Sequence, residues 1–216
     1  MKTFQLEGAP RTGLGKKEAK TLRKENMIPA VLNGGEMVEY PYAGKLQEGE
    51  KVIPVGGGKA LIVTDFKVSA DSVRKLIYTS DIFAIELKIG QKDVMAVLKD
   101  IQFHPVTGNI LHMDFLEISK EKPIVMAVPV KLVGHAEGVK AGGKLVLKMR
   151  RIKVKAKYAD IPELLEINVD SLGLGKSISV GDLSFDNLEL ISPKDALVCS
   201  VLMTRGAIAA AAAANQ

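Results

Sequence analysis

Residues 81–118 read DIFAIELKIGQKDVMAVLKDIQFHPVTGNILHMDFLEI, and this stretch decides the fold. Apolar and β-branched residues dominate three segments of it: 81–89, 93–103 and 110–118. Gly90 marks a turn between the first two segments, and Thr107 to Asn109 mark a turn before the third. The pattern predicts three consecutive strands, of which the first two form a hairpin.

The third segment, ILHMDFLEI, alternates most regularly. Successive side chains of a strand point to opposite faces, so Met113 and Phe115 are predicted on one face and His112 and Asp114 on the other. A histidine beside a carboxylate is compatible with acid–base catalysis, but no nucleophile or metal ligand accompanies this pair. The same two side chains are well suited to hydrogen-bond with base edges or 2′-hydroxyls of RNA.

A basic segment lies upstream, at residues 11–35, RTGLGKKEAKTLRKENMIPAVLNGG. Its glycines favour a loop up to Gly15, and a short helix is predicted from Lys16. The side of the helix expected to face inward carries Ala19, Leu22 and Met27. The outward side carries Lys16, Lys20, Arg23 and Lys24. This is either a solvated basic face or a surface for phosphates.

Further elements are predicted around these segments. Pro29 is expected to end the basic helix, because the residue before a proline is biased toward an extended conformation. The other N-terminal predictions are strands at 3–6, 30–33 and 61–68, a turn at Gly34–Gly35, a loop at 49–59, and a helix at 71–79 capped by Ser69.

The charge balance leans toward an anionic partner without requiring one. The 216 residues carry a net charge of +5, with a pI of about 9.1. Residues 11–25 hold six cations and two acids, so the positive charge is concentrated there. Aromatic residues make up only 5% of the chain, which supplies few rings for broad stacking on bases.

Several classes of protein are disfavoured. The single cysteine, Cys199, lies in an apolar run and is predicted to be a buried small side chain. No long apolar segment or signal peptide is apparent, so we expect a cytoplasmic protein without membrane contacts. The glycine-rich residues 55–60 lack the spacing of a phosphate-binding loop. We expect no enzymatic activity, small-molecule substrate, cofactor or metal.

The composition changes at residues 119–123, SKEKP, and the remainder predicts short strands with little helix. The fold class is therefore mainly β in two domains, the second a sandwich or barrel. The expected domains are 1–119, 120–205 and an alanine-rich tail at 206–216. One long strand is predicted over 144–160. Its basic run, 148–157, either follows a phosphate backbone or, as we favour, forms the solvated face of an edge strand.

Two motifs give the chain a family resemblance. Residues 15–35, GKKEAKTLRKENMIPAVLNGG, and 98–118, LKDIQFHPVTGNILHMDFLEI, resemble the bacterial large-subunit ribosomal proteins that bind 5S rRNA, of the general stress protein CTC type. Segments of the second half, such as HAEGVKAGGKL at 135–145, are similar to the long form of that family. The resemblance covers about residues 1–205.

The resemblance implies a structural protein of the large ribosomal subunit, located in the central protuberance. Its first domain would be a β-barrel with short helices that binds the loop E region of 5S rRNA. The second would be β-rich and contact neighbouring subunit proteins or RNA, including 23S rRNA. The implied RNA-binding positions are Arg11, Lys16, Lys20, Arg23, Asn33, Gln102, His104, His112 and Asp114.

Three positions depart from the family pattern. Lys17 stands where a glycine is usual, Lys20 where an arginine is typical, and Asn33 where a tyrosine is typical. Lys20 keeps the charge but lacks the planar fork of a guanidinium, and Asn33 cannot stack on a base. The alternative to a ribosomal protein is a stress-related paralogue that binds RNA or protein outside the ribosome.

Overall fold

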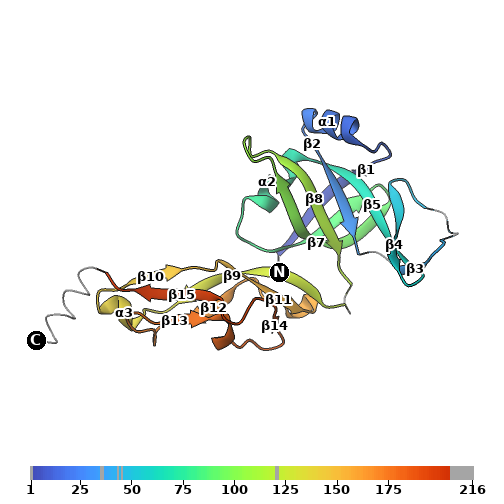
Figure 1. Ribbon diagram of the computed structural model, residues 1–216. Coiled ribbons are helices and arrows are strands. Elements are labelled where there is room, and N and C mark those ends of the chain that lie inside the picture. Colours follow the sequence, from blue (N-terminus) through green and yellow to red (C-terminus); the bar gives the residue numbers. More distant parts are fainter. Residues whose placement is uncertain (1, 35–36, 43, 45, 120–121, 205–216) are drawn as a thin grey trace, which may run out of the picture. The chain divides into compact units, whose positions relative to one another are not determined.

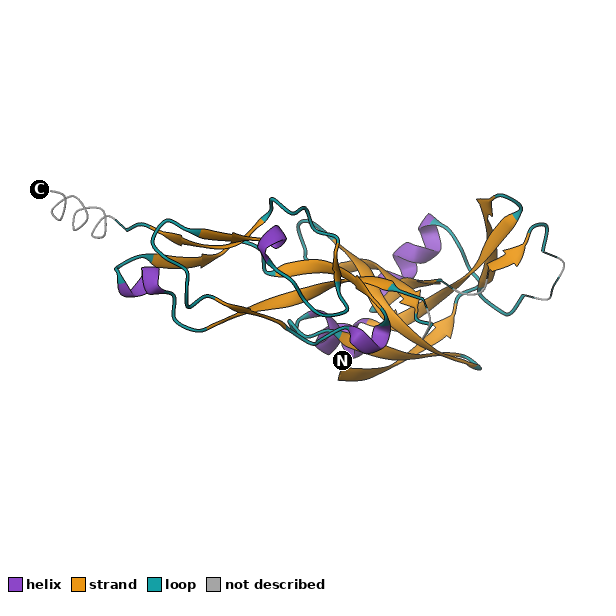
Figure 2. Cartoon of the chain, turned by 90° about the horizontal axis from the view of Figure 1, so that it is seen from below, coloured by secondary structure: helices purple, strands orange, loops and turns teal. Residues whose placement is uncertain are grey.

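The computed structural model describes residues 2–34, 37–42, 44, 46–119 and 122–204. The chain is mainly β (Figure 2) and divides into two compact units, the first ending at Lys122 and the second beginning at Pro123 (Figure 1). The predicted fold class is confirmed. The expected tail, 206–216, lies outside the described residues. Within those residues, no helix is long and apolar enough to cross a membrane.

The described residues of the first unit form eight strands and two helices. The strands are β1 (Lys2–Pro10), β2 (Met27–Asn33), β3 (Met37–Glu39), β4 (Glu50–Gly56), β5 (Lys59–Ser69), β6 (Phe83–Ile89), β7 (Lys92–Phe103) and β8 (Ile110–Glu117). The helices are α1 (Lys16–Lys24) and α2 (Ala70–Ile77).

Six of these strands close into a barrel, in the order β1-β6-β7-β8-β2-β5 and back to β1. Closure depends on β1, which pairs in parallel with β6 along its length and in antiparallel with β5 through Ala9 and Pro10. A second parallel pair joins β2 to β8. The predicted hairpin is confirmed as β6 and β7, with Gly90 in a left-handed conformation at its turn.

Two phenylalanines lie in the middle of the barrel core. Phe66 of β5 and Phe115 of β8 are both fully buried, with ring centroids 5.5 Å apart and a tilt of 47°. Leu6, Leu32 and Met113 pack in the same cluster. Phe115 and Met113 are buried, which confirms the predicted inner face of β8. The alternate positions of that strand therefore lie outside the barrel.

The loop predicted at 49–59 is wrong, because most of it is strand β4. Together with β3, this strand pairs on β5 beyond the barrel, and the three strands form an extension of the sheet (Figure 1). Pro54 is tolerated in β4, where the register with β5 is irregular. Gly56, Gly57 and Gly58 all have positive φ and make the β4–β5 turn.

The predicted end of the basic helix is also wrong. Helix α1 begins at Lys16 as expected, but it ends at Lys24, and Pro29 lies inside strand β2. The chain leaves the helix through Asn26, whose φ of 60° is in the left-handed region that asparagine tolerates. The main-chain oxygen of Asn26 then accepts a hydrogen bond from the N–H of Ala70 in α2.

The part of the second unit that the structure describes contains two small sheets. One has the order β12-β9-β11-β14 and the other β10-β15-β13. The strands are β9 (Ile124–Val133), β10 (Lys144–Leu147), β11 (Arg151–Ala156), β12 (Leu165–Asn168), β13 (Ser177–Ser179), β14 (Glu189–Leu190) and β15 (Leu197–Leu202). Its helical turns are α3 (Glu137–Lys140), η1 (Tyr158–Asp160) and η2 (Val180–Asp182).

The long strand predicted over 144–160 is broken into two strands of different sheets. β10 pairs with β15, whereas β11 pairs with β9 and β14. At the break, the N–H groups of Lys148 and Met149 both donate to the oxygen of Val198. β11 has partners on both sides, so the edge-strand interpretation of 148–157 is wrong at Val154 and Lys155, which pair with β14.

Cys199 of β15 is fully buried, as predicted. Burial raises the pKa of its thiol, although a backbone hydrogen bond involving Ile178 acts in the opposite direction. The thiol packs with Val169, Leu172 and Val201 as a small apolar side chain.

The barrel core provides the first prediction. Phe115→Ala should lower the free energy of unfolding by about 3–5 kcal/mol, because it leaves a cavity against Phe66. Chemical denaturation followed by circular dichroism measures the change. Phe115→Leu, which refills much of the space, should cost clearly less; an equal loss for both variants would contradict a packing role.

Candidate nucleic-acid interface

The outer face of the barrel carries a group of polar side chains that strand register brings together. Gln102 of β7 lies directly opposite His112 of β8, and residues opposite each other in an antiparallel pair share a face. Asn33 of β2 lies beside Leu116 of β8 through the parallel pairing. Four predicted positions, Gln102, His112, Asp114 and Asn33, therefore lie on neighbouring strands of one face. We call this the β2–β7–β8 face.

His112 and Asp114 contact each other on this face. The Nδ1 atom of His112 lies 2.9 Å from Oδ1 of Asp114, and both side chains are about 30% exposed. A proton on Nδ1 donates to the carboxylate and directs Nε2 away from it. The pair therefore presents one imidazole nitrogen and one carboxylate oxygen in a fixed orientation.

A second carboxylate, missed in the sequence, lies on the same face. Asp100 of β7 is the cross-strand partner of Asp114, and it is exposed. The pairing depends on an irregular register between Leu98 and Asp100, which the alternation of apolar residues does not reveal. Two carboxylates disfavour phosphate here and favour hydrogen-bond donors, such as base amino groups and ribose hydroxyls.

Cations dominate the neighbouring helix instead. Ala19 and Leu22 of α1 are half-buried, as predicted for the inner side, and no residue of the helix is fully buried. Lys16 and Lys20 are exposed at i, i+4 spacing. Gly15, the residue before the helix, has a φ of 114°, and no other atom lies within 4 Å of the position that a Cβ would take. The main chain is therefore accessible beside Lys16.

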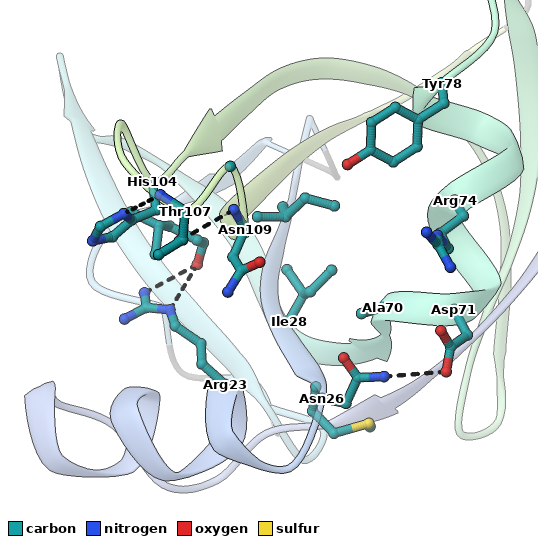
Figure 3. A pocket seen from close by; sticks show the side chains of 14 residues that line it. Arg23, Asn26, Ile28, Ala70, Asp71, Arg74, Tyr78, His104, Thr107 and Asn109 are labelled. Atoms are coloured by element: carbon teal, nitrogen blue, oxygen red, sulfur yellow. Dashed lines mark hydrogen bonds between the residues drawn. The ribbon is translucent and has the colours of Figure 1, made fainter.

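Arg23 connects this helix to strand β8. Its Nε and Nη2 groups both donate to the main-chain oxygen of Leu111, at 3.1 and 3.0 Å (Figure 3). Leu111 precedes His112 in the chain, so the contact fixes the end of α1 next to the polar face. A guanidinium has five N–H donors, and the remaining ones can still meet a ligand.

His104 organises the turn between β7 and β8. Its Nδ1 accepts hydrogen bonds from the N–H groups of Val106 and Thr107, at 3.3 and 3.1 Å, and Figure 3 shows the one from Thr107. The main chain of His104 also bonds with Asn109 and Gly108. The side chain is therefore a structural part of the turn, and only its Nε2 side can contribute to binding.

Arg11 lies apart from the other predicted positions, just beyond β1. Its N–H donates to the oxygen of Asp65 in β5 at 3.0 Å. Its Nε is buried and has no hydrogen-bond partner among the described residues. Asp65 is the cross-strand partner of Val31, which in turn lies beside Asp114. Arg11 therefore joins the far end of the row that crosses the β2–β7–β8 face.

The part of the chain that the structure describes contains no group of three or more His, Cys, Asp or Glu side chains placed to hold a metal ion. The main feature of the surface is a short basic helix that is hydrogen-bonded beside a polar face of a closed barrel. It offers cations on the helix and fixed hydrogen-bonding groups on the strands.

Family models match nearly the whole chain. The model of the ribosomal L25p family matches residues 6–53 and 45–115, and that of the C-terminal domain of ribosomal protein TL5 matches 123–205. A protein named large ribosomal subunit protein bL25 from Porphyromonas gingivalis is 53% identical over 212 residues, with 98% of each chain covered.

Proteins of the same name from Parabacteroides distasonis and Phocaeicola vulgatus are 52% and 49% identical, with 96% and 100% of each chain covered. The fold places this chain in a class of two-domain proteins with a closed N-terminal β-barrel. The chain belongs to the ribosomal L25p family, in the long form that carries the TL5-type C-terminal domain.

The contact between Arg23 and Leu111 gives the second prediction. Arg23→Lys keeps the charge but loses the two-donor contact, so α1 should open more often from the barrel. Hydrogen exchange of the amides in residues 20–24 should quicken by about fivefold, equivalent to about 1 kcal/mol. Lys24→Arg serves as the matched control; equal exchange in Arg23→Lys and the wild type would contradict a docking role.

Proposed function

We propose that this chain is a structural protein of the large ribosomal subunit, in the cytoplasm, and that it binds 5S rRNA through its N-terminal unit. Family membership supports the ribosomal role, because relatives about half identical to it over their full length are named as large-subunit proteins. RNA binding is supported chiefly by the Arg23–Leu111 contact, which holds a basic helix beside His112 and Asp114.

The helix and the sheet have different tasks in this proposal. Lys16 and Lys20 contact phosphates, for which flexible ammonium groups need no particular sequence. Gly15 lets the RNA backbone approach the main chain closely. Arg11 adds a cation at the opposite end of the row, next to Asp65.

The β2–β7–β8 face reads shape and bases. Gln102, His112 and Asn33 supply both donors and acceptors, and the carboxylate of Asp114 accepts from base amino groups or 2′-hydroxyls. An internal loop with a widened minor groove suits these groups better than a plain duplex does, because its base edges are accessible. His104 contributes through the turn that it holds and through Nε2.

We also propose the domain limits 1–119 and 120–205, with residues 206–216 as a tail. The second domain contacts neighbouring proteins of the large subunit or 23S rRNA. Exposed Arg151 and Lys153, on the outer face of β11, are compatible with the RNA contact.

Co-sedimentation tests the ribosomal role directly. The tagged chain should remain with large subunits washed at high salt, and depletion of 5S rRNA from the particles should release it. Loss of the chain from washed particles would favour a paralogue that acts outside the ribosome.

Phosphate binding by α1 gives the third prediction. Lys16→Ala should weaken binding to 5S rRNA and to an unrelated duplex by similar factors, and should lower the slope of log affinity against log salt by about 1. Electrophoretic mobility shifts across a salt series measure both. Lys59→Ala, an exposed lysine on β5, is the matched control. An unchanged slope for Lys16→Ala would rule out the contact.

Base reading by the sheet face gives the fourth prediction. Asp114→Asn and His112→Ala should reduce the preference for a loop E fragment over a plain duplex by about 1–3 kcal/mol, while the salt slope stays unchanged. Competition binding with the two RNAs measures the preference. Asp93→Asn, an exposed carboxylate elsewhere on the barrel, should behave as wild type. Equal losses on both RNAs would assign these residues to general affinity instead.

A further inference from the structure

A pocket of about 330 Å³ opens beside the proposed RNA surface (Figure 3). Three segments far apart in the sequence surround it: the end of α1, helix α2, and the turn between β7 and β8. The polar side chains and groups that line it include Arg23, Asn26, Arg74, Tyr78, His104 and Asn109. Its volume is at the lower end of the range of about 300–1,000 Å³ that is typical of small-ligand sites.

Helix α2 forms one wall. Ala70 and Arg74 of α2 and Tyr78 directly after it recur every fourth residue and so line one side, while Val73 and Leu76 on the other side are buried in the barrel core. The Arg74 guanidinium points into the pocket (Figure 3), and it has no hydrogen bond or ion pair with any described residue. Tyr78 is 67% exposed, and its ring faces the same space (Figure 3).

The opposite wall is the β7–β8 turn, which His104 holds in shape. Asn109 lines the pocket with an exposed amide. Ile28, buried in the core, provides an apolar floor between the two walls (Figure 3). The side chain of Asn26 donates to the Asp71 carboxylate at 3.1 Å. This bond ties the exit of α1 to α2 and occupies one oxygen of the acid that lines the pocket.

The charges favour an anionic ligand with a planar group. Arg23 and Arg74 outweigh Asp71, so the pocket is positive overall before any contribution from His104. An arginine can hold a phosphate with two parallel hydrogen bonds, and a tyrosine ring offers a stacking surface to a base. The amide of Asn109 can donate to and accept from a base edge.

We propose that this pocket holds one unstacked nucleotide of the RNA that α1 and the β2–β7–β8 face bind. The proposal rests on the proposed function. Arg23 connects the pocket to the proposed RNA surface, because it lines the pocket and also fixes α1 to Leu111, next to His112. Arg74 binds the phosphate, Tyr78 stacks on the base, and Asn109 contacts the base edge.

The test uses the full chain and 5S rRNA, with Arg74→Ala, Tyr78→Ala and Tyr78→Phe as variants. Lys75→Ala is the matched control, since Lys75 is exposed on the same helix but does not line the pocket. Affinities and base-specific chemical footprints are measured for each complex. The altered side chains are exposed, and thermal unfolding verifies that each variant is folded.

Arg74→Ala and Tyr78→Ala should weaken binding by at least about fivefold, and Tyr78→Ala should expose one additional nucleotide to modification while the remaining footprint is unchanged. Tyr78→Phe, which keeps the ring, should bind as the wild type does. If both alanine variants match Lys75→Ala in affinity and footprint, the pocket assignment is overturned and the proposed function stands.

If the wild-type chain itself does not bind 5S rRNA, the proposed function fails and the pocket assignment fails with it. A free nucleotide has the same chemistry as a nucleotide of RNA. A titration with the four nucleoside monophosphates, followed by nuclear magnetic resonance, distinguishes the two ligands. Binding of a free monophosphate as tight as that of the RNA, with no effect of Tyr78→Ala on RNA affinity, would identify a free-nucleotide site and overturn the RNA assignment.

Discussion

The packing of Phe66 against Phe115 determines which side of the barrel is outside. Both rings are fully buried, so β5 and β8 each have one permitted face toward the core. Because strand side chains alternate, a shift of β8 by one residue would bury His112 and Asp114 and expose Phe115. The free energy of burying two aromatic rings is large enough to exclude that shift. The polar face therefore owes its position to the core beneath it.

Regular alternation made part of this structure readable from the sequence. It placed the β6–β7 hairpin and the two faces of β8, while the glycines up to Gly15 and the helical spacing after them placed the start of α1 at Lys16. It missed β4, in which Pro54 and the following glycines suggested a loop. The break at 148–150 is visible in the sequence as a change in the alternation. The inward positions are odd at Leu145 and Leu147 and even at Ile152 and Val154.

The candidate site was less accessible, because its contacts depend on tertiary register. The sequence indicates that Arg23 is a cation, but its acceptor lies 88 residues away in the chain. His104 has a main-chain role that only the turn geometry shows. Asp100 reaches Asp114 through an irregular register. Arg74 of α2 and Tyr78 directly after that helix lie outside the basic segment at residues 11–25, and they become notable only beside the opposite wall of the pocket.

Helix α1 is a short element, and its nine residues include none that is fully buried. A helix of this length is marginal alone, so its order depends on its attachments at Arg23 and Asn26. The acceptor for Arg23 is a main-chain oxygen, which every amino acid provides. Position 111 can therefore vary in its side chain without losing the attachment, whereas position 23 cannot. The attachment of the helix to the sheet thus requires a particular side chain only at position 23, on the helix. The strand sequence is therefore free to adapt to the barrel core.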